Sequence, residues 1–278
     1  MFEGSKYAYY GMYLVGFIIM MLVNLKTYKK YELTKKTAVV LTLITYVAGV
    51  TGATIMGDIY SAVAKNYGGS AGVAIFGAVF FTPIFMILVA LVSGKSWRKV
   101  MDLLAPGIFI ILACAKFGCF MGGCCPGREC SFGVYNPNYE MTMFPSQFFE
   151  SITMDFVVAF CFWYGFKCKK FRSGSLYPVT AAVYSVTRFC WEFMRYYSTE
   201  ELRHLMFGLS FWQFWCVVVI ALSCLWIVML KSQKLDSIEA KTYSIVETKH
   251  KNFKDGFEKF KHRNDKNIVH HKKKKKKK

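Results

Sequence analysis

Three charged residues stand at helical spacing inside an apolar and aromatic stretch, "RFCWEFMR": Arg188, Glu192 and Arg195. Arg188 and Glu192 are four apart and Glu192 and Arg195 three apart, so all three share one face of a helix. A guanidinium offers a planar fork of donors that suits a phosphate. The motif therefore indicates an anion site, with Glu192 orienting Arg188 or exchanging a proton. The alternative is a structural ion-pair ladder, since an unpaired arginine inside a membrane costs at least about 2.5 to 3.5 kcal/mol.

A second unusual stretch, "KFGCFMGGCCPGREC" (116–130), closes an apolar run with Lys116 and then crowds together four glycines, four cysteines and a proline. The cysteine spacing, C-x4-CC-x4-C, matches none of the usual zinc-ligand patterns and no histidine lies nearby, so we expect no metal. A disulfide, a reactive thiol and simple tight packing remain open. Irregular backbone at membrane depth is tolerated only where it is buried or lines a cavity, so this stretch is expected to line one.

The elements that must position these residues are apolar spans separated by basic loops. The chain has 278 residues, is 54% hydrophobic and carries a formal net charge of +19, which fits a membrane protein better than one soluble core. Seven stretches approach the length of about 20 residues that crosses a bilayer: 9–25, 38–57, 72–92, 103–120, 148–166, 177–195 and 209–230. We therefore predict an all-α fold, a polytopic integral membrane protein of about seven transmembrane helices.

Lysine and arginine gather in alternate loops, after the first, third, fifth and seventh spans. The positive-inside rule then predicts the N-terminus outside and the C-terminus in the cytoplasm. Residues 1–230 would form a seven-helix membrane domain, and 231–278 a basic, mostly disordered cytoplasmic tail. The tail ends in "HHKKKKKKK", which we expect to be attracted to an anionic membrane surface. No nucleic-acid-binding module accompanies this charge, so nucleic acid is not an expected partner.

This topology gathers further polar residues with the charged ones at the outer ends of the spans. They are Tyr10, Tyr67, Gly68, Gly69, Gln147 and Glu150. The segment "YGGSAG" (67–72) indicates either close helix packing or a backbone turn whose N–H groups face an anion. The natural anion at the outer leaflet is a phospholipid headgroup, so we expect the helices to surround an outer-leaflet lipid cavity.

Six motifs, in order, resemble those of the prolipoprotein diacylglyceryl transferase family over roughly residues 9–230. "YYGMYLVGF" is similar to the family's W-Y-G-L-M-Y-L segment, and "YGGSAGV" to H-G-G-L-I-G-A. "MDLLAP" and the 116–130 stretch resemble D-x-x-A-P and the signature G-R-x-G-N-F-x-N-x-E-x-x-G. "FPSQFFES" resembles H-P-x-Q-L-Y-E, "RFCWEFMR" resembles R-F-x-x-E-F-x-R, and "GLSFWQFWC" is similar to G-L-S-x-G-Q-x-x-S. Each motif is short, but the ordered set is specific.

The resemblance implies an enzyme of the bacterial plasma membrane that moves the diacylglyceryl group of phosphatidylglycerol to the lipobox cysteine thiol of a secreted prolipoprotein. It implies a catalytic set of Arg188, Lys116, Glu192 and Tyr67, in which Arg188 and Lys116 bind the phosphate and Glu192 orients Arg188. It places substrate-binding roles on Tyr10, Gly68, Gly69, Cys119, Gly127, Gln147 and Glu150. The nucleophile belongs to the substrate, so no cofactor is implied and none of the chain's own cysteines has to react.

The chain departs from the family pattern at several of these positions. Lys116 replaces the signature arginine and keeps its charge without the planar fork of donors. Cys119 replaces the first asparagine, and Tyr67 and Phe144 replace both motif histidines. Another group would have to move the proton, and Tyr67 and Glu150 are the candidates. A tyrosine is a poor base because its pKa is usually about 10.

Two other functions remain open. The lost histidines and asparagines would suit a non-catalytic lipid- or lipoprotein-binding membrane protein of the same fold. The cysteine cluster would suit a thiol-dependent redox or transport protein, which requires Cys124 and Cys125 to be essential. The transferase interpretation predicts instead that serine is tolerated at both positions.

Overall fold

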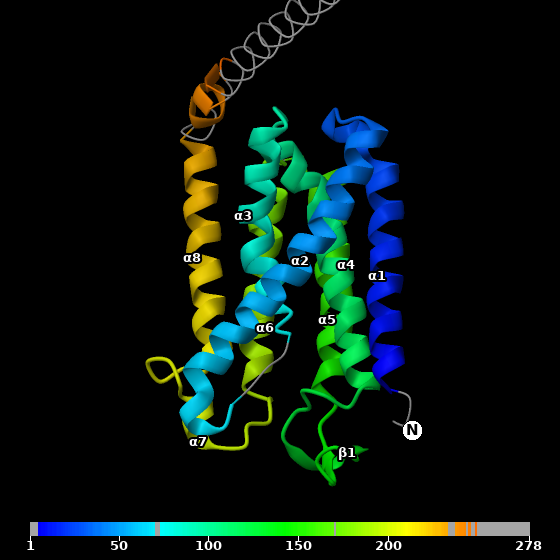
Figure 1. Cartoon of the computed structure of the whole chain (residues 1–278), viewed down its shortest axis with the longest axis vertical. Coiled ribbons are helices and arrows are strands. Elements are labelled where there is room, and N and C mark those ends of the chain that lie inside the picture. The colour runs from blue at the N-terminus through cyan, green and yellow to red at the C-terminus, as the bar shows by residue number, and fades with distance from the viewer. Residues whose placement is uncertain are drawn as a thin grey trace, which may run out of the picture.

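Seven long helices run up and down through the described part of the chain, which in this computed structural model comprises residues 5–69, 73–169, 171–232, 237–242, 244, 245 and 248 (Figure 1). They are α1 (Ser5–Thr27), α2 (Lys35–Ala64), α3 (Phe76–Val92), α4 (Trp97–Met121), α5 (Ser146–Phe166), α6 (Leu176–Glu192) and α8 (Phe211–Lys231). The minor elements are η1 (Tyr28–Tyr31), η2 (Lys65–Tyr67), α7 (Glu200–Arg203) and the antiparallel strands β1 (Glu129–Asn136) and β2 (Met141–Met143). The all-α prediction is confirmed, with one small hairpin added.

Five of the described helices, α1, α2, α4, α5 and α8, are long and apolar enough to cross a membrane, and α3 is a shorter apolar helix. The chain is therefore a multi-pass membrane protein. α6 has only 17 residues and carries Arg188 and Glu192, so its crossing, and with it the count of seven, stays a prediction. Each predicted span corresponds to a helix, but two predicted ends are wrong: the second helix passes residue 57, and the sixth stops at Glu192, so Arg195 lies beyond the helix and not on one helical face with Arg188 and Glu192. α2 continues through Asp58 to Ala64, because the first backbone in the left-handed region comes only at Gly68 (φ 72°).

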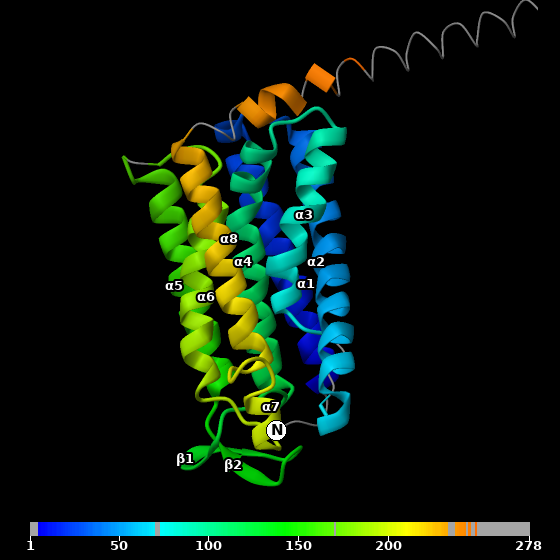
Figure 2. The same ribbon diagram turned by 90° about the vertical axis from the view of Figure 1, so that its left-hand side faces the viewer.

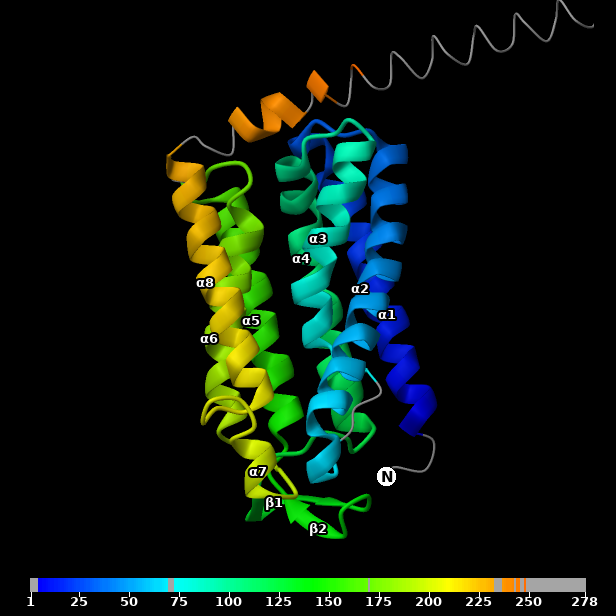
Figure 3. The same ribbon diagram turned by 60° about the vertical axis from the view of Figure 1, so that its left-hand side comes forward.

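The loops fall at two opposite ends of the bundle (Figures 2 and 3). The lower end in these views carries β1, β2 and α7, and we call it the hairpin end. The upper end carries the loops 28–34, 93–96 and 167–175, and we call it the basic end. There Lys99 pairs with Glu32, and Lys30 donates a hydrogen bond to the carbonyl of Gly165. The loops therefore alternate between the ends in the order that the lysine-rich segments predicted.

α4 is the central helix, and it packs against α1, α3, α5 and α6. Leu103, Leu104, Ala105 and Phe109 are fully buried, as expected for a helix that is apolar on all sides. At its basic end the buried carboxylate of Asp102 accepts hydrogen bonds from the backbone N–H groups of Gly174 (2.6 Å) and Leu176 (3.0 Å). Leu176 begins α6, so α4 fixes the start of the helix that carries Arg188.

The tail was predicted to be mostly disordered. Residues 249–278 lie outside the described residues, so that part of the prediction is not tested. Residues 237–242 form a short helical segment at the basic end. Glu239 in this segment is buried, accepts a hydrogen bond from Ser96 and pairs with Arg98.

α2 and α3 cross at a pair of glycines, and this crossing gives a stability prediction. A Cβ on Gly77 would lie 2.1 Å from the carbonyl oxygen of Gly52. We expect Gly77→Ala to lower the free energy of unfolding by about 1 to 3 kcal/mol, because the helices must move apart. Gly11→Ala is the control, since a Cβ there meets nothing within 4 Å. Thermal unfolding in detergent measures both. Equal unfolding temperatures for the two variants would contradict the prediction.

Candidate functional site: a cation-lined pocket at the hairpin end

The charged residues of α6 form one buried network with residues of α4 and α5. Arg188 pairs through Nη2 with Glu192, and its Nη1 lies 3.8 Å from Oε1 of Glu150. Lys116 pairs with the other oxygen of Glu150. Arg195, just past the end of α6, places its Nη1 4.0 Å from Oε1 of Glu150. Glu150 is thus shared by three cations, and the sequence did not reveal that it joins them.

A pocket of about 110 Å³ lies against this network. Its lining residues are Tyr9, Val73, Ala74, Ile75, Phe76, Lys116, Cys119, Cys124, Cys125, Tyr184, Arg188, Arg195 and Trp212. All three cations face the pocket, whereas the carboxylates of Glu150 and Glu192 lie behind them, outside its lining. The Nη1 atoms of Arg188 and Arg195 are buried and have no hydrogen-bond partner in the described part of the chain. Buried donors of this kind normally have a hydrogen-bond partner, so the charge and the donors of this pocket are suited to an anion.

Glu192 is held on its far side by the loop that leads into α8. Oε1 of Glu192 accepts hydrogen bonds from the hydroxyls of Tyr197 and Ser210, the latter at 3.1 Å. Ser210 is also the N-cap of α8, where it forms a capping box with Gln213. The carboxylate is therefore fixed from two sides, and it fixes Arg188 in turn. This geometry is compatible with the orienting role predicted for Glu192, which stays a prediction.

The stretch 116–130 forms the last part of α4 and an irregular turn that leads toward β1. Gln147 on α5 donates a hydrogen bond to the carbonyl of Cys124 (2.6 Å), so it pins the turn and does not line the cation pocket. The backbone of Gly127 lies between two other backbone segments. A Cβ there would lie 2.8 Å from the carbonyl oxygen of Met194 and 2.9 Å from that of Phe144. Gly127 forms a bridge with Arg195. Gln147 and Gly127 thus lie outside the pocket lining and make structural contacts, and the substrate-binding role predicted for them stays a prediction.

Three of the four clustered cysteines, Cys119, Cys124 and Cys125, line the pocket as free thiols, and Cys130 lies outside it. The thiol of Cys124 donates a hydrogen bond to the backbone carbonyl of Cys119 at 3.7 Å. The hydrogen bond with Cys119, and then burial, raise the pKa of Cys124 to about 12, and the pKa of Cys125 is raised as well. A thiol reacts as its thiolate, so these thiols are held in the unreactive form. Among the described residues, no group of three or more histidine, cysteine, aspartate or glutamate side chains is arranged to hold a metal ion.

This thiol chemistry gives a second prediction. We expect Cys124→Ser to retain activity within about threefold, because a protonated thiol and a hydroxyl make similar hydrogen bonds and neither is a nucleophile at neutral pH. We also expect Cys124 to resist maleimide labelling at pH 7.5, well below its pKa of about 12. Mass spectrometry of the labelled protein checks this, with Cys168, in the loop after α5, as the reactive control. Rapid labelling of Cys124 together with loss of activity in the serine variant would support a thiol-dependent protein instead.

Two predicted tyrosines do not reach the pocket. Tyr10 is 68% exposed and Tyr67 is 44% exposed, and neither belongs to the lining. The residue before Tyr10 lines it instead, because one step along a helix turns a side chain by about 100°. That residue, Tyr9, shares a hydrogen bond of 3.1 Å with the hydroxyl of Tyr13.

The two predicted glycines of the 67–72 segment also lie away from the lining. Gly68 adopts a left-handed backbone with open space around it. Gly69 packs closely, since a Cβ there would lie 2.6 Å from Cβ of Ala64 and 2.8 Å from Leu202 of α7. Close packing is therefore the role of Gly69. Residues 70–72 of this segment lie outside the described residues.

The sequence did point to Lys116, Arg188 and Cys119 in the pocket and to Glu150 and Glu192 beside it. It placed Arg195 in the same motif but gave it no catalytic or binding role, although the third charge of "RFCWEFMR" was the available signal. Nothing in the sequence singled out Trp212 or Tyr184, which are aromatic residues among many others.

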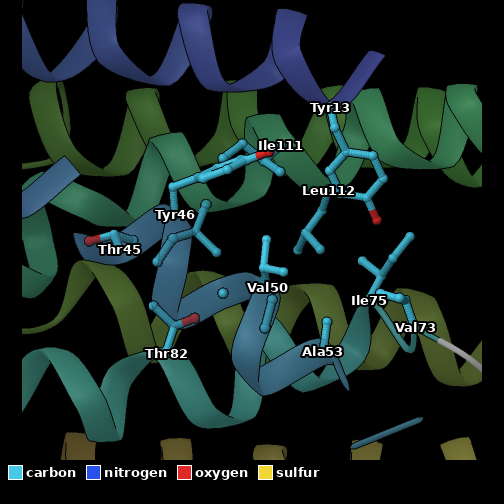
Figure 4. Close-up of a pocket in the computed structure, with 13 residues that line it drawn as sticks. Tyr13, Thr45, Tyr46, Val50, Ala53, Val73, Ile75, Thr82, Ile111 and Leu112 are labelled. Carbon is cyan, nitrogen blue, oxygen red and sulfur yellow. The ribbon is translucent and has the colours of Figure 1, made fainter. Parts of the chain in front are cut away.

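A second, apolar pocket of about 50 Å³ adjoins the first between α1, α2, α3 and α4. The two pockets share Val73 and Ile75 in their linings. Figure 4 shows Tyr13, Leu112 and Ile75 on one side of this apolar pocket and Thr45, Tyr46 and Thr82 on the other. A cation-lined pocket and an apolar pocket therefore lie side by side at this end of the bundle.

The fold and the site together define a multi-pass membrane protein with a pocket lined by three cations. The chain belongs to the prolipoprotein diacylglyceryl transferase family, whose model matches residues 3–229. It is 30% identical over 173 residues to phosphatidylglycerol–prolipoprotein diacylglyceryl transferase 2 of Clostridium perfringens, an alignment that covers 55% of this chain and 65% of that protein.

Two further relatives carry the same enzyme name. The Clostridium tetani protein is 31% identical over 134 residues, which cover 45% of this chain and 52% of that protein. The protein of Dehalococcoides mccartyi strain 195 is 29% identical over 133 residues, which cover 45% of this chain and 50% of that protein. The chain thus spans between half and about two thirds of the length of the curated relatives it matches.

Proposed function

We propose that this chain transfers the diacylglyceryl group of phosphatidylglycerol to the lipobox cysteine thiol of a prolipoprotein. The names of its relatives state a diacylglyceryl transfer that involves phosphatidylglycerol and a prolipoprotein. The observation that carries the proposal is the arrangement of charge in the pocket: Lys116, Arg188 and Arg195 face the cavity, and Glu150 and Glu192 lie behind them. An apolar pocket adjoins this site and shares Val73 and Ile75 with it, which suits a substrate with an apolar part.

The net charge of the site suits a phosphodiester. Three cations against two carboxylates leave one positive charge, which matches the single negative charge of phosphatidylglycerol. Neither arginine is fully satisfied, since each keeps a buried Nη1 without a hydrogen-bond partner among the described residues. Charge-assisted hydrogen bonds from these two groups to the phosphate oxygens would hold the donor lipid. Lys116 adds charge without the fork, so it acts as a point charge.

The reaction balances in atoms and charge as follows. The substrate thiol attacks the glyceryl carbon that carries the phosphate, a carbon–sulfur bond forms, and the carbon–oxygen bond to the phosphate breaks. The leaving group is glycerol phosphate, which gains negative charge as that bond breaks. The three cations stabilise this developing charge, and such preorganised stabilisation is usually the largest contribution to rate. The second pKa of a phosphate monoester is about 6, so above that pH one proton is released in each turnover.

The proton needs no histidine in this scheme. Neither candidate base is well placed: Tyr67 lies outside the pocket, and Glu150 is neutralised by three cations. The thiol proton is therefore expected to pass to the departing phosphate and then to water. This also accounts for a transferase that lacks both motif histidines.

The same proposal sets the membrane orientation. The positive-inside rule puts the basic end in the cytoplasm and the hairpin end, with the pocket, at the outer leaflet of a bacterial plasma membrane. Secreted prolipoproteins would meet the pocket there. The lysine-rich tail would lie on the anionic cytoplasmic surface, where each basic residue contributes about 1 kcal/mol.

A transfer assay tests the proposal directly. Purified protein is incubated with phosphatidylglycerol and a lipobox peptide, and the peptide mass is followed. We expect a gain of one diacylglyceryl group, absent with a peptide whose cysteine is serine and much reduced with phosphatidylcholine as donor.

The second candidate is a non-catalytic lipid-binding protein of the same fold, which the absent histidines favour. Phosphatidylglycerol bound to the protein without any transfer would support that candidate and contradict ours.

A further inference from the structure

A large apolar groove lies between α3 and α8, away from the cation pocket. Its volume is about 400 Å³, compared with about 110 Å³ for the pocket, and the two share no lining residue. Its deep surface includes Val79, Ala181 and Val219, which are buried. Its rim includes Ile84, Leu222 and Leu225, which are 48 to 56% exposed. The groove is thus open along the side of the bundle. We call it the α3–α8 groove.

The groove is closed at the basic end by a segment of the tail. Ile238 and Thr242 belong to its lining, together with Trp97 and Trp226. The segment is fixed by Glu239, which accepts a hydrogen bond from Ser96 (2.7 Å) and pairs with Arg98. Glu239 is only 5% exposed, so its ion pair with Arg98 is buried and holds the segment 237–242 over the end of the groove. The groove therefore has a definite end, at the basic end of the bundle.

The lining chemistry selects a hydrocarbon occupant. The lining is almost entirely aliphatic and aromatic, and the hydroxyl of Tyr177 is already bonded to the carbonyl of Val79. Water does not fill apolar space of this kind, because it needs two to four polar partners. The helices that form the rim are apolar and face the bilayer, where lipid chains are the abundant apolar molecules. A volume of about 400 Å³ is also within the range of ligand sites, about 300 to 1,000 Å³.

Charge at the closed end selects the headgroup. Lys231, at the end of α8, and Lys241, in the segment 237–242, are both exposed there. Glu239, the acidic residue of this segment, is neutralised by Arg98. Basic pockets between membrane helices on this side bind anionic lipid headgroups.

We propose that the α3–α8 groove binds one acyl chain of an anionic phospholipid from the leaflet at the basic end, with Lys231 and Lys241 at its headgroup. This is a site separate from the substrate pocket and does not depend on the transfer activity.

Photolabelling of the full chain in lipid nanodiscs tests the site. The probe is a phosphatidylglycerol with a diazirine in one acyl chain, and the adducts are mapped by peptide mass spectrometry. Ser223 lies in the groove and is buried, so Ser223→Phe fills it; Ala221→Phe is the matched control on the exposed side of α8. We expect groove adducts on α3 and α8 to fall at least fivefold in Ser223→Phe and to stay within twofold of wild type in Ala221→Phe.

The headgroup is tested with the same diazirine chain on phosphatidylcholine. We expect weaker labelling with this zwitterionic probe, and we expect the preference to disappear in Lys231→Gln/Lys241→Gln. Equal labelling in Ser223→Phe and wild type overturns the site, and equal labelling by the two probes overturns the anionic headgroup. If Ser223→Phe does not fold, Ala181→Leu fills the same groove from α6 and answers the question.

Discussion

Arg188→Ala is expected to lower kcat/KM for diacylglyceryl transfer by about 100- to 1,000-fold. The guanidinium faces the pocket, and its Nη1 has no hydrogen-bond partner among the described residues, so under the proposed function this atom donates to the phosphate. Removing one preorganised donor from a site of developing charge costs about that factor. Arg188→Lys should recover only part of the loss, because the ammonium keeps the charge and loses the planar fork. The peptide mass assay with phosphatidylglycerol measures all three proteins.

Stability must be separated from catalysis in this test. Arg188→Ala also leaves Glu192 without its buried partner, and breaking such a pair costs about 3 to 5 kcal/mol. The double variant Arg188→Met/Glu192→Gln removes one charge of each sign, so it should fold more stably than Arg188→Ala and remain inactive. Arg203→Ala breaks an exposed pair with Glu200 and serves as the surface control. Transfer above a third of the wild-type rate in a folded Arg188→Ala protein would remove Arg188 from the site.

Glu150→Gln is expected to cause the largest loss of stability of any single change in the site. The carboxylate is 2% exposed and lies among Lys116, Arg188 and Arg195, which would repel one another without it. Loss of a buried partner costs about 3 to 5 kcal/mol, which corresponds to a fall in unfolding temperature on the order of 10 °C. Thermal unfolding in detergent at neutral pH measures it.

A double-mutant cycle attributes this loss to charge. Adding Lys116→Met to Glu150→Gln restores the charge balance, so the double variant should regain much of the lost stability. Glu200→Gln, which changes an exposed glutamate, should shift the unfolding temperature by less than about 1 °C. If Glu150→Gln unfolds at the wild-type temperature, or if Lys116→Met lowers the temperature further in the double variant, Glu150 is not the shared counter-ion.

Helix positions and loop order followed from the sequence because a bilayer leaves the backbone few choices. Backbone N–H and C=O groups in hydrocarbon must bond within the chain, so an apolar run such as 209–230 becomes a helix, here Phe211–Lys231. The polar hairpin of β1 and β2 and the helix α7 were not predicted. They lie outside the apolar spans, where side-chain and tertiary contacts decide the local structure.

Part of the candidate site could be predicted from the sequence for a similar reason. Charges in apolar helices are costly, so Lys116, Arg188 and Glu192 stood out and lie together at the hairpin end. Tyr10 was chosen where Tyr9 lines the pocket, because the rotation of a helix about its axis is set by packing. The sequence likewise gave no reason to place Glu150 between three cations that come from α4, α6 and the turn after α6.

By itself, then, the sequence determined the class of this protein, the helices, the alternation of its loops and the main charged residues, because each of these follows from the cost of placing polar groups in hydrocarbon. Only the tertiary structure decided which charges face the pocket and which lie behind it, that Gly127 and Gln147 hold the turn, and that the start of the tail closes the α3–α8 groove. Those features depend on distances between residues far apart in the chain, such as Arg98 and Glu239, which no local pattern encodes.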